Sequence, residues 1–271
     1  MTPRASLALR VVAALATLGN LAFNFGYARL GLLPNDVPTV SAQYQSAFTP
    51  AGFTFAIWGV IYTSWLVLVG ALLFWRHARE HRALDALVPG FIALNALCSA
   101  WIVAFSFEAL WTSVAIIAVQ LALGAWLLVR ATRIVEAESA SVFTPVPLAL
   151  FTGWIGVAAI ANVATALVAD GVLGQDDGPP FALAMLAVAA VLGVVGAVRT
   201  GSGVPAVIAW AAFGIHRANL GVNPSVSTAA VCVAIGLALL AAWAPAARWG
   251  AATAARSPLW QRHGYRGSVA R

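Results

Sequence analysis

Apolar residues along this chain occur in long uninterrupted runs rather than in alternation with polar ones. A helix needs about 20 apolar residues to cross the roughly 30 Å hydrocarbon core of a bilayer. Runs of that length recur from one end of the sequence to the other, separated by short polar breaks rich in glycine, proline and aspartate. The pattern predicts eight membrane-spanning helices, at residues 7–31, 51–75, 86–106, 110–130, 146–169, 180–198, 203–220 and 226–246.

Composition supports this interpretation. The chain is 62% hydrophobic and 9% charged, with a mean hydropathy of +0.89, too little charge to cover the surface of a soluble domain. Continuous apolar runs exclude a β-barrel, whose strands alternate. We therefore expect an all-α, polytopic integral membrane bundle with the lipid bilayer as its surroundings. Cys98 and Cys232 fall inside predicted spans, where small buried hydrophobes are expected rather than a disulfide or a metal site.

The distribution of basic residues predicts an orientation. All 15 basic residues are arginine, and the absence of lysine excludes a retinal-type Schiff base. With the N-terminus in the cytoplasm, only Arg29 and Arg217 fall on the outer side, which satisfies the positive-inside rule. Both termini are therefore expected in the cytoplasm, with 248–271 as a basic tail. Because the net charge of +6 lies in segments that flank the spans, it does not indicate a nucleic-acid partner.

One face of the second predicted span is aromatic. Phe55, Trp58, Tyr62 and Trp65 follow one another at i, i+3, i+7 and i+10, the spacing of one helical face. Flat rings can stack on a planar ligand, and tyrosine and tryptophan each add one polar group. The same pattern is also typical of helix–helix packing, so both interpretations stay open.

The third and fifth predicted spans add further candidates. Asn95 and the deep Trp101 lie on the third, and Trp154, Ala158 and Asn162 stand at i, i+4 and i+8 on the fifth. The alanine leaves a gap between two larger groups, which fits either a planar ligand or a close helix contact. Amides inside a bilayer usually turn inward and hydrogen-bond between helices, so bridging and ligand contact are both expected roles.

Several of these residues match a known family. Residues 49–62 resemble the P-P-x-x-x-F/L-x-x-V-W-x-x-L-Y motif of the TspO/MBR family, which comprises tryptophan-rich sensory proteins and the mitochondrial translocator protein. Pro50, Trp58 and Tyr62 stand in register with it. Residues 94–99 are similar to the family's L-N-x-x-W-S, although a cysteine replaces the tryptophan. The pair Trp154 and Asn162 is similar to its fifth helix.

The resemblance implies a fold and a function. It covers 1–169 and implies a five-helix bundle that binds tetrapyrroles such as porphyrin or haem, sterols or similar molecules in a pocket under the first loop, for sensing or transport in a bacterial cell membrane. Residues 170–247 then add three helices, which are expected to cap the bundle or to form a homodimer interface. The expected ligand-binding residues are Phe55, Trp58, Tyr62, Trp65, Asn95, Trp101, Trp154, Ala158 and Asn162.

The sequence is also compatible with other functions. The alternatives are a secondary transporter for a small solute, a membrane enzyme that degrades porphyrin, and an assembly partner that docks through the last three helices. The sequence shows no nucleophile–base, paired-carboxylate or phosphate-binding arrangement. His77 and His81 supply only half a metal site. We therefore expect no catalytic residues, no bound metal and no cofactor, and we do not expect an enzyme.

Overall fold

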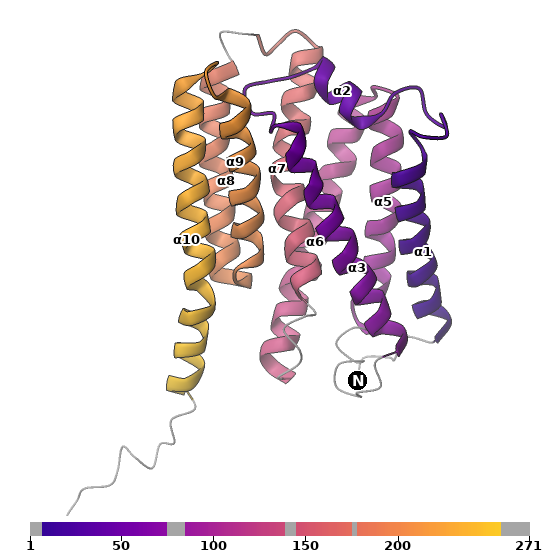
Figure 1. The fold of residues 1–271 in the computed structure, drawn as a ribbon. Helices are drawn as coiled ribbons and strands as arrows, with labels where there is room; N and C mark the ends of the chain where they lie inside the picture. The colour runs from indigo at the N-terminus through magenta and orange to yellow at the C-terminus, as the bar shows by residue number, and fades with distance from the viewer. Residues whose placement is uncertain (1–6, 75–84, 139–144, 175–177, 256–271) are drawn as a thin grey trace, which may run out of the picture.

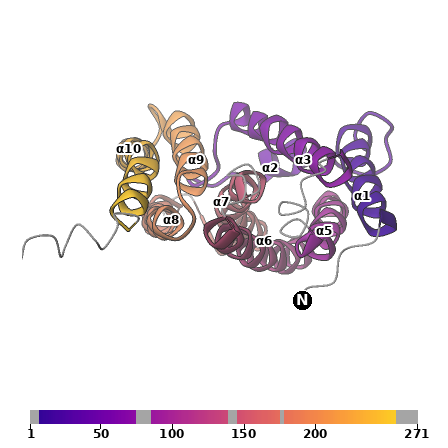
Figure 2. The same cartoon turned by 90° about the horizontal axis from the view of Figure 1, so that it is seen from below.

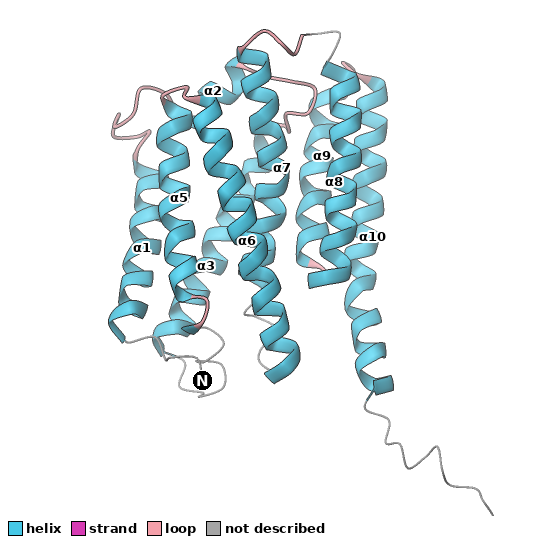
Figure 3. Ribbon diagram, turned by 180° about the vertical axis from the view of Figure 1, so that it is seen from behind, coloured by secondary structure: helices cyan, strands magenta, loops and turns pink. Residues whose placement is uncertain are grey.

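The protein is an all-α membrane bundle. The computed structural model describes residues 7–74, 85–138, 145–174 and 178–255, and within these ranges the chain forms helices and turns without a strand (Figure 3). Seven helices in the described part are long and apolar enough to cross a bilayer. The predicted fold class is therefore confirmed. The elements are α1 (Leu7–Gly26), α2 (Val37–Gln43), the 3₁₀ helix η1 (Gly52–Ala56), α3 (Ile57–Phe74), α5 (Val88–Ser106), α6 (Leu110–Glu138), α7 (Pro145–Ala169), α8 (Gly178–Thr200), α9 (Gly203–Asn219) and α10 (Pro224–Ala255).

The seventh predicted span, 203–220, is a shorter helix than the others. The seven long spans comprise α1, η1 continued by α3, α5, α6, α7, α8 and the first part of α10. Helix α9 has 17 residues and runs the same course between α8 and α10 (Figure 1). The chain thus crosses the bundle eight times in the described residues, and α1 begins at the end of the bundle where α10 finishes. Placement of that end in the cytoplasm stays a prediction.

Some helix ends differ from the predicted spans. Helix α1 stops at Gly26 because the chain turns through residues 27–31, where Gly31 takes a φ of +61° that favours glycine. Helices α6 and α10 continue past the predicted ends, to Glu138 and Ala255, because hydropathy marks only the part of a helix that is apolar. The predicted tail 248–271 is therefore helical up to residue 255, and 256–271 lies outside the described residues.

The helices form two groups. Seen along the bundle axis, α1, α3, α5, α6 and α7 surround a common centre, and α8, α9 and α10 stand together beside α7 (Figure 2). Small residues allow close approach between the groups, as membrane helices require. A Cβ on Gly153 of α7 would lie 3.0 Å from the carbonyl oxygen of Val204 on α9. The division into a five-helix part (1–169) and a three-helix part (170–247) stays a prediction.

A chain of buried polar side chains joins α1, α3 and α5. Asn20 donates to the Asn95 side-chain oxygen at 3.3 Å and accepts from the Ser99 hydroxyl at 3.0 Å. Asn24 donates to the Asn20 side chain at 2.9 Å and accepts from the Tyr62 hydroxyl at 2.6 Å. These bonds join three helices, the bridging role expected of amides in lipid.

An ion pair ties α1 to the start of α5. The Arg10 guanidinium donates to both carboxylate oxygens of Asp85. Its Nε bonds to Oδ1 and its Nη2 to Oδ2, both at 2.9 Å. The Asp85 side chain is 2% exposed and the Arg10 side chain 16%. Two parallel hydrogen bonds of this kind give the strongest geometry available to an arginine and a carboxylate.

Candidate functional site

The aromatic face of α3 points into the five-helix group. Phe55 of η1 packs edge-on against Trp154 of α7 at 5.6 Å between ring centroids. Trp58 stacks on Tyr62 at 5.1 Å and meets Trp154 edge-on at 6.4 Å. The predicted helical spacing therefore brings rings from α3 and α7 together, in the offset and edge-on arrangements that aromatic pairs prefer.

These rings border a cavity inside the bundle. Its volume is about 370 Å³, within the range of about 300–1,000 Å³ typical of small-molecule pockets. Its walls come from α1, α3, α5, α6 and α7, and the short helix α2 contributes Val37 and Pro38. Six of the nine residues predicted from the sequence line it: Phe55, Trp58, Tyr62, Trp101, Trp154 and Ala158.

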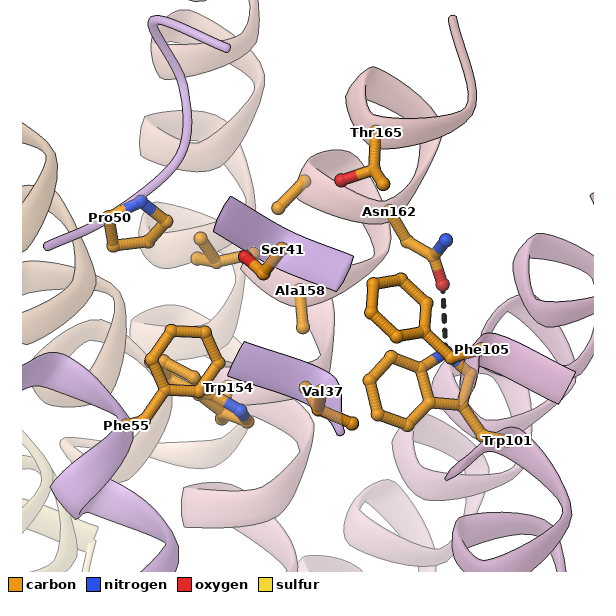
Figure 4. A pocket seen from close by; sticks show the side chains of 12 residues that line it. Val37, Ser41, Pro50, Phe55, Trp101, Phe105, Trp154, Ala158, Asn162 and Thr165 are labelled. Carbon is orange, nitrogen blue, oxygen red and sulfur yellow. Dashed lines mark hydrogen bonds between the residues drawn. The ribbon is translucent and has the colours of Figure 1, made fainter. Parts of the chain in front are cut away.

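A smaller chamber of about 50 Å³ adjoins the main cavity. The two share five lining residues, including Trp101, Trp154 and Ala158. Figure 4 shows Phe55 and Trp154 on one side of this chamber, Trp101 on the other, and Ala158 between them. Asn162 also lines the chamber, so seven of the nine predicted residues contact one or other space.

Trp65 and Asn95 lie outside both linings. Trp65 is fully buried, with its ring 4.9 Å from Phe91 and 5.1 Å from Phe151. Asn95 bonds to Asn20 and donates to the backbone of Phe91 at 2.9 Å. Contacts with neighbouring side chains and backbone occupy both residues, so the structure does not bring them to the cavity.

Hydrogen bonds fix some polar groups of the site and leave others free. The Trp101 indole donates to Asn162 at 2.7 Å, and the Asn162 amide donates to the Ser113 hydroxyl at 2.9 Å. In contrast, the indole nitrogens of Trp58 and Trp154 make no hydrogen bond to the described part of the chain. Trp154 is only 3% exposed. Its indole N–H makes no hydrogen bond within the described residues, so it is a free donor that a ligand acceptor would satisfy.

Helix α2 lies at one end of the bundle (Figure 1), where its Val37 and Pro38 line the cavity and cover it. The Val37 amide, at its start, donates to the Tyr27 hydroxyl at 3.0 Å. Asn35, before the helix, and Tyr44, after it, both donate to the Glu108 carboxylate, at 3.0 and 2.7 Å. Glu108 itself takes a positive φ of 56°, a conformation uncommon outside glycine. One carboxylate thus secures both ends of the covering helix.

The polar groups around α2 have shifted acidities. Donation to the Glu108 carboxylate raises the pKa of the Tyr44 phenol, because that hydrogen bond requires the protonated hydroxyl. Hydrogen bonds from Thr39 hold the pKa of Asp36 below its ordinary value. Asp36 also caps the helix by accepting from the Thr39 amide at 2.8 Å. Tyr44 is therefore protonated and Asp36 ionised at neutral pH, the forms in which they make these hydrogen bonds.

The lining of both spaces is neutral. Asn24, Tyr62, Gln120 and Asn162 supply amides and hydroxyls, and no arginine, histidine or carboxylate is among the described residues that line either space. Sequence reasoning missed Gln120, whose side chain donates to the backbone of Leu97 at 3.0 Å. A lone amide in the middle of the span 110–130 was the signal that could have found it.

A membrane-spanning helical bundle with an aromatic-lined internal cavity defines the class of this protein. The chain matches the family model for TSPO-like protein over residues 10–243, and it therefore belongs to the TSPO-like family. The resemblance seen in its motifs is confirmed. The match continues past residue 169 through α8, α9 and most of α10. No curated protein and no solved structure matches the chain.

Proposed function

We propose that this protein binds a flat, hydrophobic molecule, with only uncharged parts of it inside the cavity, and serves as a sensor or carrier for it. The TspO/MBR resemblance supplies the candidate classes, tetrapyrroles first and sterols second. The observation that supports the proposal is an internal cavity of about 370 Å³ whose wall is aromatic. Rings from η1, α3, α5 and α7 offer faces and edges to a planar molecule.

The polar chemistry of the wall favours a neutral ligand. Taking an ionised group out of water without a partner costs several kcal/mol, and the described lining offers no opposite charge. The unpartnered N–H groups of Trp58 and Trp154 suit a neutral acceptor, such as a ring nitrogen or a carbonyl. Charged substituents of a bound molecule would therefore have to remain outside the cavity.

Titration with protoporphyrin tests the proposal. The full-length protein in mild detergent is expected to shift the porphyrin absorption band in a saturable way. Trp154→Ala removes an aromatic ring of the cavity wall together with its free N–H, so we expect about tenfold weaker binding. The control is Trp243→Ala, which removes an indole that is 64% exposed on α10. Absence of saturable binding, or equal losses in both variants, would contradict the proposal.

The neutral lining predicts a preference between two related probes. Protoporphyrin carries two carboxylates, which its dimethyl ester masks. We expect the ester to bind about tenfold more tightly, because the acid must hold its charges at the mouth of the cavity. Both affinities are corrected for partition into protein-free micelles. Tighter binding of the free acid after this correction would show that a cationic group reaches the ligand, against the proposed site.

A further inference from the structure

Helix α9 holds the segment that leads into α3. Residues 47–56, here named the entrance segment, comprise the end of the first loop and η1. Three hydrogen bonds join this segment to α9. The Gly214 carbonyl accepts from the Ala51 amide at 3.1 Å, the Trp210 indole donates to the Thr54 carbonyl at 3.0 Å, and the Asn219 amide donates to the Ala47 carbonyl at 2.8 Å.

The contact is tight as well as hydrogen-bonded. A Cβ on Gly214 would collide with the Thr54 methyl carbon and lie 3.2 Å from the Pro50 Cβ. Phe53 of the segment packs edge-on against the rings of Trp210 and Phe213, at 5.6 and 6.1 Å. Closely packed interiors are hard to compress and transmit strain. We therefore expect a displacement at Gly214 to move the whole entrance segment.

The entrance segment also forms part of the cavity wall. Pro50 lines the smaller chamber, Phe55 lines both spaces, and Trp58 follows in the first turn of α3. The described residues that line either space include none from α8, α9 or α10. The three C-terminal helices therefore reach the cavity indirectly, through α7 and through the entrance segment that α9 holds.

We propose that α9 is a positioning element for the cavity: through Gly214, Trp210 and Asn219 it fixes the entrance segment, and so sets the shape and the closure of the site. The contacts between α9 and the entrance segment are independent of the proposed ligand binding. Only the expected effect on ligand affinity rests on that proposed function. This positioning gives the C-terminal helices a role within the same chain. Loosening the contact should open the cavity and weaken ligand binding together.

Gly214→Ala is the decisive variant. Alanine favours a helix over glycine, so any loss comes from the collision with Thr54. The matched control is Gly236→Ala on α10, where an added Cβ meets nothing within 4 Å. A second variant, Thr54→Ser combined with Gly214→Ala, deletes the colliding methyl and leaves contacts of 3.2 Å. We expect this pair to restore the wild-type behaviour, which a general loss of stability would not allow.

Two readouts separate the positioning role from ligand binding. Cys98 lines the main cavity and is 4% exposed. In a background with Cys232→Ser, its labelling by a small thiol reagent reports closure without any ligand. Protoporphyrin titration reports the site itself. We expect Gly214→Ala to label about tenfold faster and to bind about tenfold more weakly, with Gly236→Ala at wild-type values.

Each outcome decides the proposal. If wild-type protein binds no porphyrin, the proposed function fails, and the labelling of Cys98 still tests the positioning role alone. If Gly214→Ala does not fold, Trp210→Phe, which removes the bond to Thr54 and keeps a smaller aromatic ring beside Phe53, must accelerate labelling for the proposal to stand. Unchanged labelling in the folded variants, or a labelling rate that the Thr54→Ser change does not restore, overturns it.

Discussion

Ala158→Phe is expected to abolish ligand binding while leaving the protein folded. Ala158 lines both the main cavity and the smaller chamber, between the side chains of Trp154 and Asn162 on α7. A phenyl ring there would occupy the space that a planar ligand needs. We expect at least a roughly hundredfold loss of affinity, which corresponds to about 2.7 kcal/mol, measured by porphyrin titration in detergent.

The control for this variant is Ala184→Phe, which places the same ring on the exposed face of α8. Its affinity and its unfolding midpoint should match those of the wild type. Filling an existing cavity commonly preserves or raises stability, so Ala158→Phe should unfold no earlier than the control. If Ala158→Phe kept the wild-type affinity, the ligand would have to lie elsewhere than in this cavity.

The helical periodicity of the sequence predicted the aromatic wall, because the face on which a residue lies depends only on its own helix. Phe55, Trp58 and Tyr62 share a face at any placement of the helix, and the polar groups of Trp58 and Tyr62 favour turning that face away from lipid. Trp154 and Ala158 follow from the same rule on α7. The family motif then identified which inward faces belong together, and Trp58 does meet Trp154 at 6.4 Å.

Periodicity gives the face of a residue but not its depth in the bundle. Trp65 shares the stripe of Trp58 and Tyr62, yet it lies where Phe91 and Phe151 close the core. Asn95 faces inward as predicted, but its side chain bonds to Asn20 on α1 and to the Phe91 carbonyl of its own helix. The distance between helices decides whether an inward side chain meets a cavity or a neighbour, and that distance is set by pairs of residues remote in sequence.

The resemblance implied a pocket under the first loop, but the contacts that hold the cover and the entrance segment were beyond sequence reasoning for a related reason. Val37 and Pro38 reach the cavity because Asn35 and Tyr44 both bond to Glu108, more than 60 positions away. Ala47, Ala51 and Thr54 are held by a helix more than 150 positions away. Neither contact has a local pattern, because each joins a backbone group or one polar side chain to a distant partner.

The ion pair between Arg10 and Asp85 was missed in the same way, and it supports the largest expected change in stability. From the sequence, Arg10 was only one of the arginines expected on the cytoplasmic side. In the structure it neutralises a carboxylate that is 2% exposed at its side chain. Removing one member of a buried pair leaves an uncompensated charge and typically costs about 3–5 kcal/mol.

Asp85→Ala should therefore lower the free energy of unfolding by about 3 kcal/mol, toward the small end of that range because Arg10 is partly exposed. Denaturant unfolding in detergent measures the change, and Asp170→Ala, at an exposed acid, is the control with an expected loss below about 1 kcal/mol. Arg10→Met combined with Asp85→Leu should recover most of the loss, because an apolar pair leaves no buried charge. Equal losses for Asp85→Ala and Asp170→Ala, or a double variant no better than Asp85→Ala, would show that the pair does not hold α1 to α5.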